Sequence, residues 1–262
     1  MSVVRGVATV FRFEWKRSLT VPRAIWWVLL ASFPPALLLL VRLNVGPPPS
    51  PEPIPIVIFV LCPGVVCMMG VFLWATPWIS SELEGRSWVY PAVRPRGALA
   101  VMLGKYLVAV TWTLPAALLA TTLGVLAMGG EDSMRILWVE SRLVFLSCFS
   151  YGAVFTLIGV MFPKRAMVVG VFFAVLFEVV LASIPAAVNL LTIQFRLRCL
   201  GVRWMDWPPS FAADTPVFQA YFGDESAAWH LFVLFAMTIG LLAAAAAVLR
   251  IREFTAEAET DV

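Results

Sequence analysis

Long apolar runs, each bounded by charged or turn-forming residues, constrain the fold of this chain more than any other feature. The first run, 24–41, contains no charged residue and lies between Arg23 and Arg42. A membrane-spanning helix needs roughly 20 mainly apolar residues. Charged residues make up only 13% of the 262-residue chain and apolar residues 61%, whereas soluble domains carry about 25% charged residues. The sequence therefore predicts an all-α polytopic membrane protein.

The apolar runs divide the chain into three parts. We predict a single transmembrane domain over 24–252, with six spans at about 24–41, 54–79, 106–128, 143–162, 166–181 and 229–249. Residues 1–23 are expected to form a cytoplasmic interfacial helix, and 253–262 an acidic cytoplasmic tail. The spans use much of the chain, so a separate catalytic domain of about 100–150 residues does not fit.

The distribution of Lys and Arg predicts the orientation. With the N-terminus inside, the inner segments hold thirteen Lys and Arg residues and the outer segments hold six. Short cytoplasmic loops are enriched in these residues. We therefore expect a multi-pass protein of the cytoplasmic (inner) membrane with both termini in the cytoplasm. The net charge of +3 is explained by this topology and predicts no nucleic-acid partner.

The N-terminal segment has an amphipathic helical pattern. At about 100° per residue, Arg5, Arg12 and Lys16 fall on one face and Trp15 roughly opposite, with Glu14 interrupting the apolar side. One interpretation is an interfacial helix that anchors to membrane lipid, with cations on anionic headgroups and aromatics in the acyl boundary. The alternative is a helix packed on a protein partner.

Two features inside the spans are candidate elements of a substrate path. Pro34 and Pro35 should kink or break the first span, either as a tolerated kink or to shape a path. Glu178 lies about thirteen residues beyond the turn at 163–165, which is ~20 Å along a helix, and we expect it to be the only carboxylate inside a span. It would bond to a neighbouring helix or the outer segment, or else contact a cation or substrate or carry a proton.

Motifs for catalysis and cofactor binding are missing from the sequence. It contains no G-x-x-x-x-G-K-[ST] phosphate loop, no H-E-x-x-H and no G-x-S-x-G, and His230 is the only histidine. The four cysteines show no metal-binding or disulfide spacing. We therefore expect no enzyme activity, no metal and no cofactor in this chain.

The polar segment between the second and third spans carries a recognisable pattern. Glu82, Glu84 and Gly85 are followed by Arg86, by Arg94-Pro95-Arg96, and ten residues after the proline by Lys105 at the foot of the third span. This resembles the first cytoplasmic loop of ABC-type export permeases of the six-span type 2 class. The sequence has Arg86 where that class usually has Thr, and Ala98 where it usually has Arg. The basic N-terminus, the six spans and the long outer segment are also similar to that class.

The resemblance implies a function and partners. It implies the permease subunit of an ATP-driven export complex, paired with a second permease as a homodimer or heterodimer. Separate ATPase subunits would carry ATP and Mg²⁺, and Glu82, Glu84, Gly85, Arg86, Arg94 and Pro95 would couple to them. Residues 189–200 would form re-entrant helices. A secondary transporter and a non-transport membrane scaffold are the alternatives.

Overall fold

The computed structural model describes residues 3–45, 53–85, 88, 96–130, 132–184, 187–206, 222–223 and 225–252. Within these ranges the regular structure is helical and no strand occurs. Six helices are long and apolar enough to cross a membrane: Val21–Asn44, Ile54–Glu84, Gly97–Met128, Ser133–Met161, Ala166–Ser183 and Ala227–Ile251. The chain is therefore an all-α polytopic membrane protein, and the predicted fold class and number of spans are confirmed.

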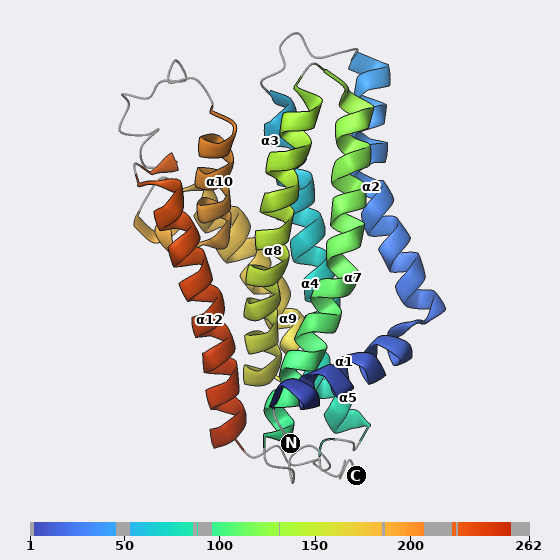
Figure 1. Ribbon diagram of the computed structural model, residues 1–262, viewed down its shortest axis with the longest axis vertical. Coiled ribbons are helices and arrows are strands. Elements are labelled where there is room, and N and C mark those ends of the chain that lie inside the picture. Colours follow the sequence, from blue (N-terminus) through green and yellow to red (C-terminus); the bar gives the residue numbers. More distant parts are fainter. Residues whose placement is uncertain are drawn as a thin grey trace.

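The fourth span, α8 (Ser133–Met161), forms the centre of the bundle. It packs against α7 (Gly97–Met128), α4 (Cys67–Ala75), α10 (Ile193–Trp204) and α12 (Ala227–Ile251), and Figure 1 shows it between α7 and α12. Close packing, more than apolar character, drives helix association in lipid. Where α4 meets α7, a Cβ at Gly70 would lie 2.4 Å from Thr113 Cγ2, so this approach requires glycine.

The second span changes its helical geometry along its length. It begins with α3 (Pro53–Phe59), continues as a π-helix (Val60–Val66), and ends with α4 and α5 (Trp78–Glu84). Pro63, which lacks an N–H group, lies inside the π-helix. The Ser147 hydroxyl of α8 donates a 2.6 Å hydrogen bond to the Pro63 carbonyl. A side chain from the neighbouring span therefore supports the irregular backbone.

The fifth span also contains a π-helix and leads into a shorter helix. It consists of α9 (Ala166–Phe173), the π-helix Ala174–Val180 and a 3₁₀ turn, Leu181–Ser183. A second 3₁₀ turn, Ala187–Leu191, precedes α10. Figure 1 shows α10 beside α8 and α12 in only one half of the bundle. The predicted outer segment thus folds back along the spans as a short helix.

The first span, α2 (Val21–Val45), is one continuous helix that includes Pro34 and Pro35. The prolines do not break it, although its direction changes along its length in Figure 1. α2 packs along α7. Of the two outcomes expected for this span, a kink or a break, the break is therefore excluded.

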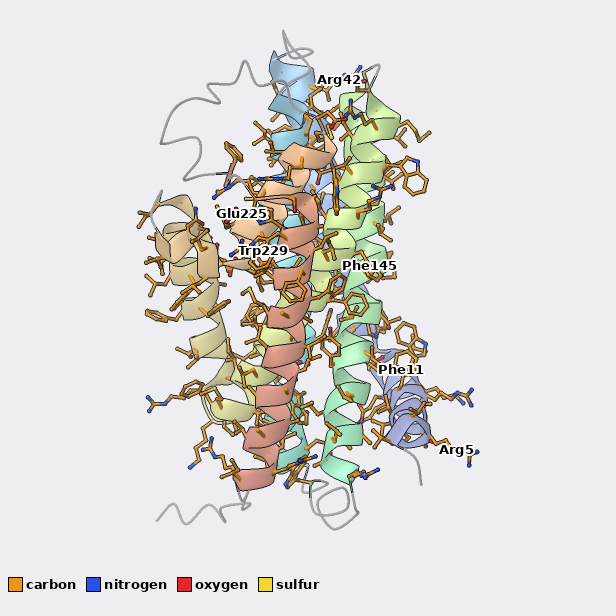
Figure 2. All side chains as sticks on the ribbon, turned by 60° about the vertical axis from the view of Figure 1, so that its left-hand side comes forward. Arg5, Phe11, Arg42, Phe145, Glu225 and Trp229 are labelled. Carbon is orange, nitrogen blue, oxygen red and sulfur yellow. The ribbon has the colours of Figure 1, made fainter. Side chains whose placement is uncertain are left out.

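The N-terminal helix α1 (Val3–Ser18) crosses one end of the bundle and packs on α7. Figure 1 places α1, α5 and the last turn of α12 at the same end. Figure 2 shows Arg5 and Phe11 of α1 far from Arg42, which lies at the opposite end. Packing requires Gly104, because a Cβ there would lie 2.6 Å from Val10 Cγ1.

Candidate functional site

The main candidate site is a cavity of about 330 Å³ between spans two, four and five and α10. Both π-helices contribute to its wall, through Val60 and Gly64 on one side and Glu178 and Val179 on the other. π-Helical segments are frequent at functional sites. Most of the lining is apolar, and its few polar groups come from α8, span five and α10. These features are typical of a binding site for a small, mainly apolar molecule.

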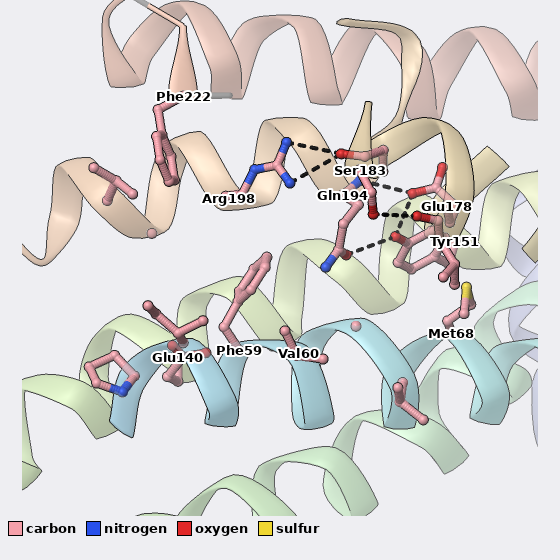
Figure 3. A pocket seen from close by; sticks show the side chains of 18 of the residues that line it. Phe59, Val60, Met68, Glu140, Tyr151, Glu178, Ser183, Gln194, Arg198 and Phe222 are labelled. Atoms are coloured by element: carbon pink, nitrogen blue, oxygen red, sulfur yellow. Dashed lines mark hydrogen bonds between the residues drawn. The ribbon is translucent and has the colours of Figure 1, made fainter. Parts of the chain in front are cut away.

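Glu178 closes one part of this cavity by capping α10. Its carboxylate accepts hydrogen bonds from the backbone N–H groups of Ile193 (3.2 Å) and Gln194 (2.9 Å) and from the Tyr151 hydroxyl (2.8 Å) (Figure 3). The Thr192 hydroxyl accepts from the next N–H group, that of Phe195, at 3.2 Å. A helix N-terminus has free N–H groups and a partial positive charge. The bond to the outer segment, one of the alternatives for Glu178, is therefore present.

A second acidic residue, Glu140 of α8, also lines the cavity. It is 2% exposed, and Oε2 has no hydrogen-bond partner among the described residues. The helix of span four begins at Ser133, ten residues before the predicted start of this span at 143, and Glu140 lies in that added part. The first turns of this helix contain polar residues, so the apolar run in the sequence begins later than the helix.

Arg198 of α10 is the third charged residue in the lining. Both of its terminal nitrogens donate to the Ala182 carbonyl at 3.2 Å, and its guanidinium carbon lies 5.9 Å from the centre of the Phe222 ring. Figure 3 shows Arg198 and Gln194 along one wall and Glu140 and Val60 along the other. The described lining thus contains two carboxyl groups and one guanidinium.

The cavity has lining residues on the outer surface of the bundle. Ile56 and Val60 of span two are 45% and 47% exposed, and Val179 of span five is 55% exposed, yet all three line the cavity. In a bilayer, apolar side chains at these positions would face lipid. The cavity therefore reaches the apolar surface of the single chain between spans two and five.

A cluster of charges joins the helices at the α1 end of the bundle. Lys105 of α7 forms an ion pair with Glu82 of α5 and lies 3.8 Å from a carboxylate oxygen of Glu14 of α1. Glu82 is buried, so its carboxylate is turned toward the bundle. The spacing of the loop did not predict this pair, because it joins residues on different helices.

The other predicted coupling residues are only partly described. Glu84 and Gly85 are exposed at the end of α5. Arg86, Arg94 and Pro95 lie outside the described residues, as does the tail 253–262.

The predicted membrane anchors of α1 separate into two groups. Arg5, Arg12 and Lys16 are exposed. Trp15 instead packs inward, with its ring centre 5.3 Å from that of Trp112 of α7. Trp15 thus packs on α7 of the same chain, whereas Phe13 of α1 is 63% exposed.

The remaining predicted path residues, Pro34 and Pro35, do not line the cavity. No group of three or more potential metal ligands occurs among the described residues. Compared with known proteins, the chain matches no family model and no curated sequence.

Proposed function

We propose that this chain is the permease subunit of an ATP-binding-cassette export complex in the cytoplasmic membrane, acting with a separate ATPase. The second span carries the proposal. The second span, Ile54–Glu84, is a run of successive helical segments with a turn at 76–77 between α4 and α5. The exposed Glu84 lies at one end, and residues from Pro55 to Met68, toward the other end, form a wall of the cavity. A partner that displaces α5 would therefore move the wall of the cavity, as in the rigid-element transitions of other switching proteins.

The ion pairs of Lys105 would spread such a displacement to the rest of the bundle. Lys105 links α5 through Glu82, and α1 through Glu14, to the foot of α7. Pairs that are largely withdrawn from water are screened less by salt than exposed pairs. Movement of α5 would thus carry the third span and α1 with it. In this proposal the Glu82–Lys105 ion pair holds α5 against α7, and the exposed surface around Glu84 and Gly85 contacts the ATPase.

The energy source follows from the sequence and the resemblance. The chain has no phosphate-binding loop, so the proposal assigns ATP and Mg²⁺ to the partner. Two permease chains would pair side by side with two ATPase subunits, as the resemblance implies. Both termini would lie in the cytoplasm, in agreement with the excess of Lys and Arg at that end.

Affinity purification of the tagged chain tests the proposal. A second chain that hydrolyses ATP should be recovered in roughly equal amount, and Glu84→Lys should reduce its recovery. Asp132→Lys is the matched control, since it makes the same charge change at an exposed acid that precedes α8. Equal recovery in both variants would remove the α5 surface from this role.

A different outcome would favour a secondary transporter. The two buried acids, Glu140 and Glu178, are the observation on this side, because acids inside spans often mark ion or proton pathways. Flux driven by an ion gradient, measured in liposomes that contain this chain alone, would replace the ATP-driven proposal.

A further inference from the structure

The cavity has an uneven charge balance, and Glu140 is its source. Among the three charged residues of the described lining, Glu178 is bonded to three donors, and the partners of Arg198 include the Ala182 carbonyl. Glu140 is as deeply buried as the core residues around it. Among the residues that the structure describes, its Oε2 atom has no partner.

An acidic side chain in this position needs a partner or a proton. Burying an ionised carboxylate without compensation is costly, and acids inside membrane spans are mostly paired or mark pathways for ions and substrates. Glu178 meets this requirement through the N-terminus of α10. Glu140 is itself one of the residues that line the cavity, and a molecule bound there can supply the missing positive charge.

The rest of the cavity suits the apolar part of such a molecule. Phe59 and Val60 lie along the same wall as Glu140 in Figure 3, and Met68 lies further along that wall. Aromatic faces attract cations in addition to burying apolar surface. The surface-exposed lining residues between spans two and five would admit a molecule that first dissolves in the bilayer.

We propose that this cavity binds a monovalent organic cation with an apolar body, and that the Glu140 carboxylate recognises its charge. The inference names a substrate class and rests on the proposed permease function for its transport, but not for its binding. Arg198 sets the selectivity from the opposite wall, because it repels a second positive charge. Hydrophilic cations are excluded, since most of the lining offers no polar contact.

Binding is tested on the purified full-length chain in lipid nanodiscs without an ATPase. The probe is tritiated tetraphenylphosphonium, with empty nanodiscs subtracted, and unlabelled tetraphenylborate is the competitor of similar size and opposite charge. We expect saturable binding of the cation that tetraphenylborate does not displace. Glu140→Gln should weaken binding roughly 30-fold or more, which corresponds to the lower end of the loss for a broken buried charge pair.

Two matched controls accompany these measurements. Asp132→Asn removes an exposed carboxylate two turns before Glu140 and should leave binding unchanged. Val60→Trp should fill the cavity and abolish binding, whereas Val57→Trp, in the same span but outside the lining, should not. If Glu140→Gln does not fold, two other measurements test the proposal. They are the comparison of Val60→Trp with Val57→Trp and the comparison of tetraphenylphosphonium with tetraphenylborate.

Three results would overturn the proposal: no saturable binding of the cation, equal binding by Glu140→Gln, or displacement by tetraphenylborate. The last result would assign recognition to Arg198. A negative result in the cation-binding assay does not affect the ATPase co-purification. Failure to recover an ATPase does not affect the cation-binding result. The two proposals can therefore fail separately.

Discussion

The cap that Glu178 provides for α10 leads to a quantitative prediction. Glu178→Ala removes the acceptor for the Ile193 and Gln194 N–H groups and for the Tyr151 hydroxyl. The hydroxyl keeps a second acceptor, the Gln194 side-chain oxygen, at 3.3 Å. Two backbone donors are then left unpaired, and each costs about 1–3 kcal/mol. The free energy that holds α10 against span five should therefore fall by about 2–6 kcal/mol.

Cys199 reports the detachment of α10, because its thiol is fully buried in that helix. Burial raises the pKa of this thiol to about 12 against the opposing effect of nearby arginines, and the thiolate is the reactive form. Maleimide should therefore label Cys199 very slowly at pH 7.5 in the wild type. In Glu178→Ala the rate should rise about 30-fold or more, since labelling follows the open population.

The controls come from the same bundle. Tyr151→Phe removes only the hydroxyl contact and should raise the labelling rate far less. Cys148 is buried in α8 and serves as the internal standard, with both sites quantified by mass spectrometry after a common quench. If Cys199 is labelled equally slowly in Glu178→Ala and in the wild type, Glu178 does not hold α10 in place and the reasoning fails.

Two further predictions concern the α1 end of the bundle. Gly104→Leu should separate α1 from α7, because a Cβ there already lies 2.6 Å from Val10 Cγ1; limited proteolysis should cut α1 faster, whereas Gly240→Leu, with nothing within 4 Å of its Cβ, should not change cleavage. Lys105→Met leaves Glu82 without this cation and should lower the free energy of unfolding by up to about 3 kcal/mol; Lys105→Arg should recover most of it. An unchanged thermal midpoint in Lys105→Met would contradict the role of this pair.

The sequence by itself determined the spans. An apolar segment of about 20 residues must satisfy its backbone groups internally, and in lipid a helix does so with local hydrogen bonds. Length and apolar composition were therefore enough to predict the six spans. The amphipathic helical pattern that places Arg5 and Arg12 on one face was enough to predict α1. Pro34 and Pro35 showed the limit of this reasoning, because packing of α2 along α7 keeps the helix unbroken where local rules also allowed a break.

Only the tertiary structure decided which polar residues meet. Glu178 bonds to N–H groups fifteen and sixteen residues further along the chain, and Lys105 pairs with Glu82 from another helix. Glu140 lies in the cavity wall because α8 begins at Ser133 and carries this residue alongside span two and α10. Hydrophobic periodicity describes one helix at a time, whereas these contacts depend on how the spans rotate and pack against each other. Local composition thus determines the membrane-spanning helices, whereas the candidate site depends on contacts between segments that are distant in the sequence.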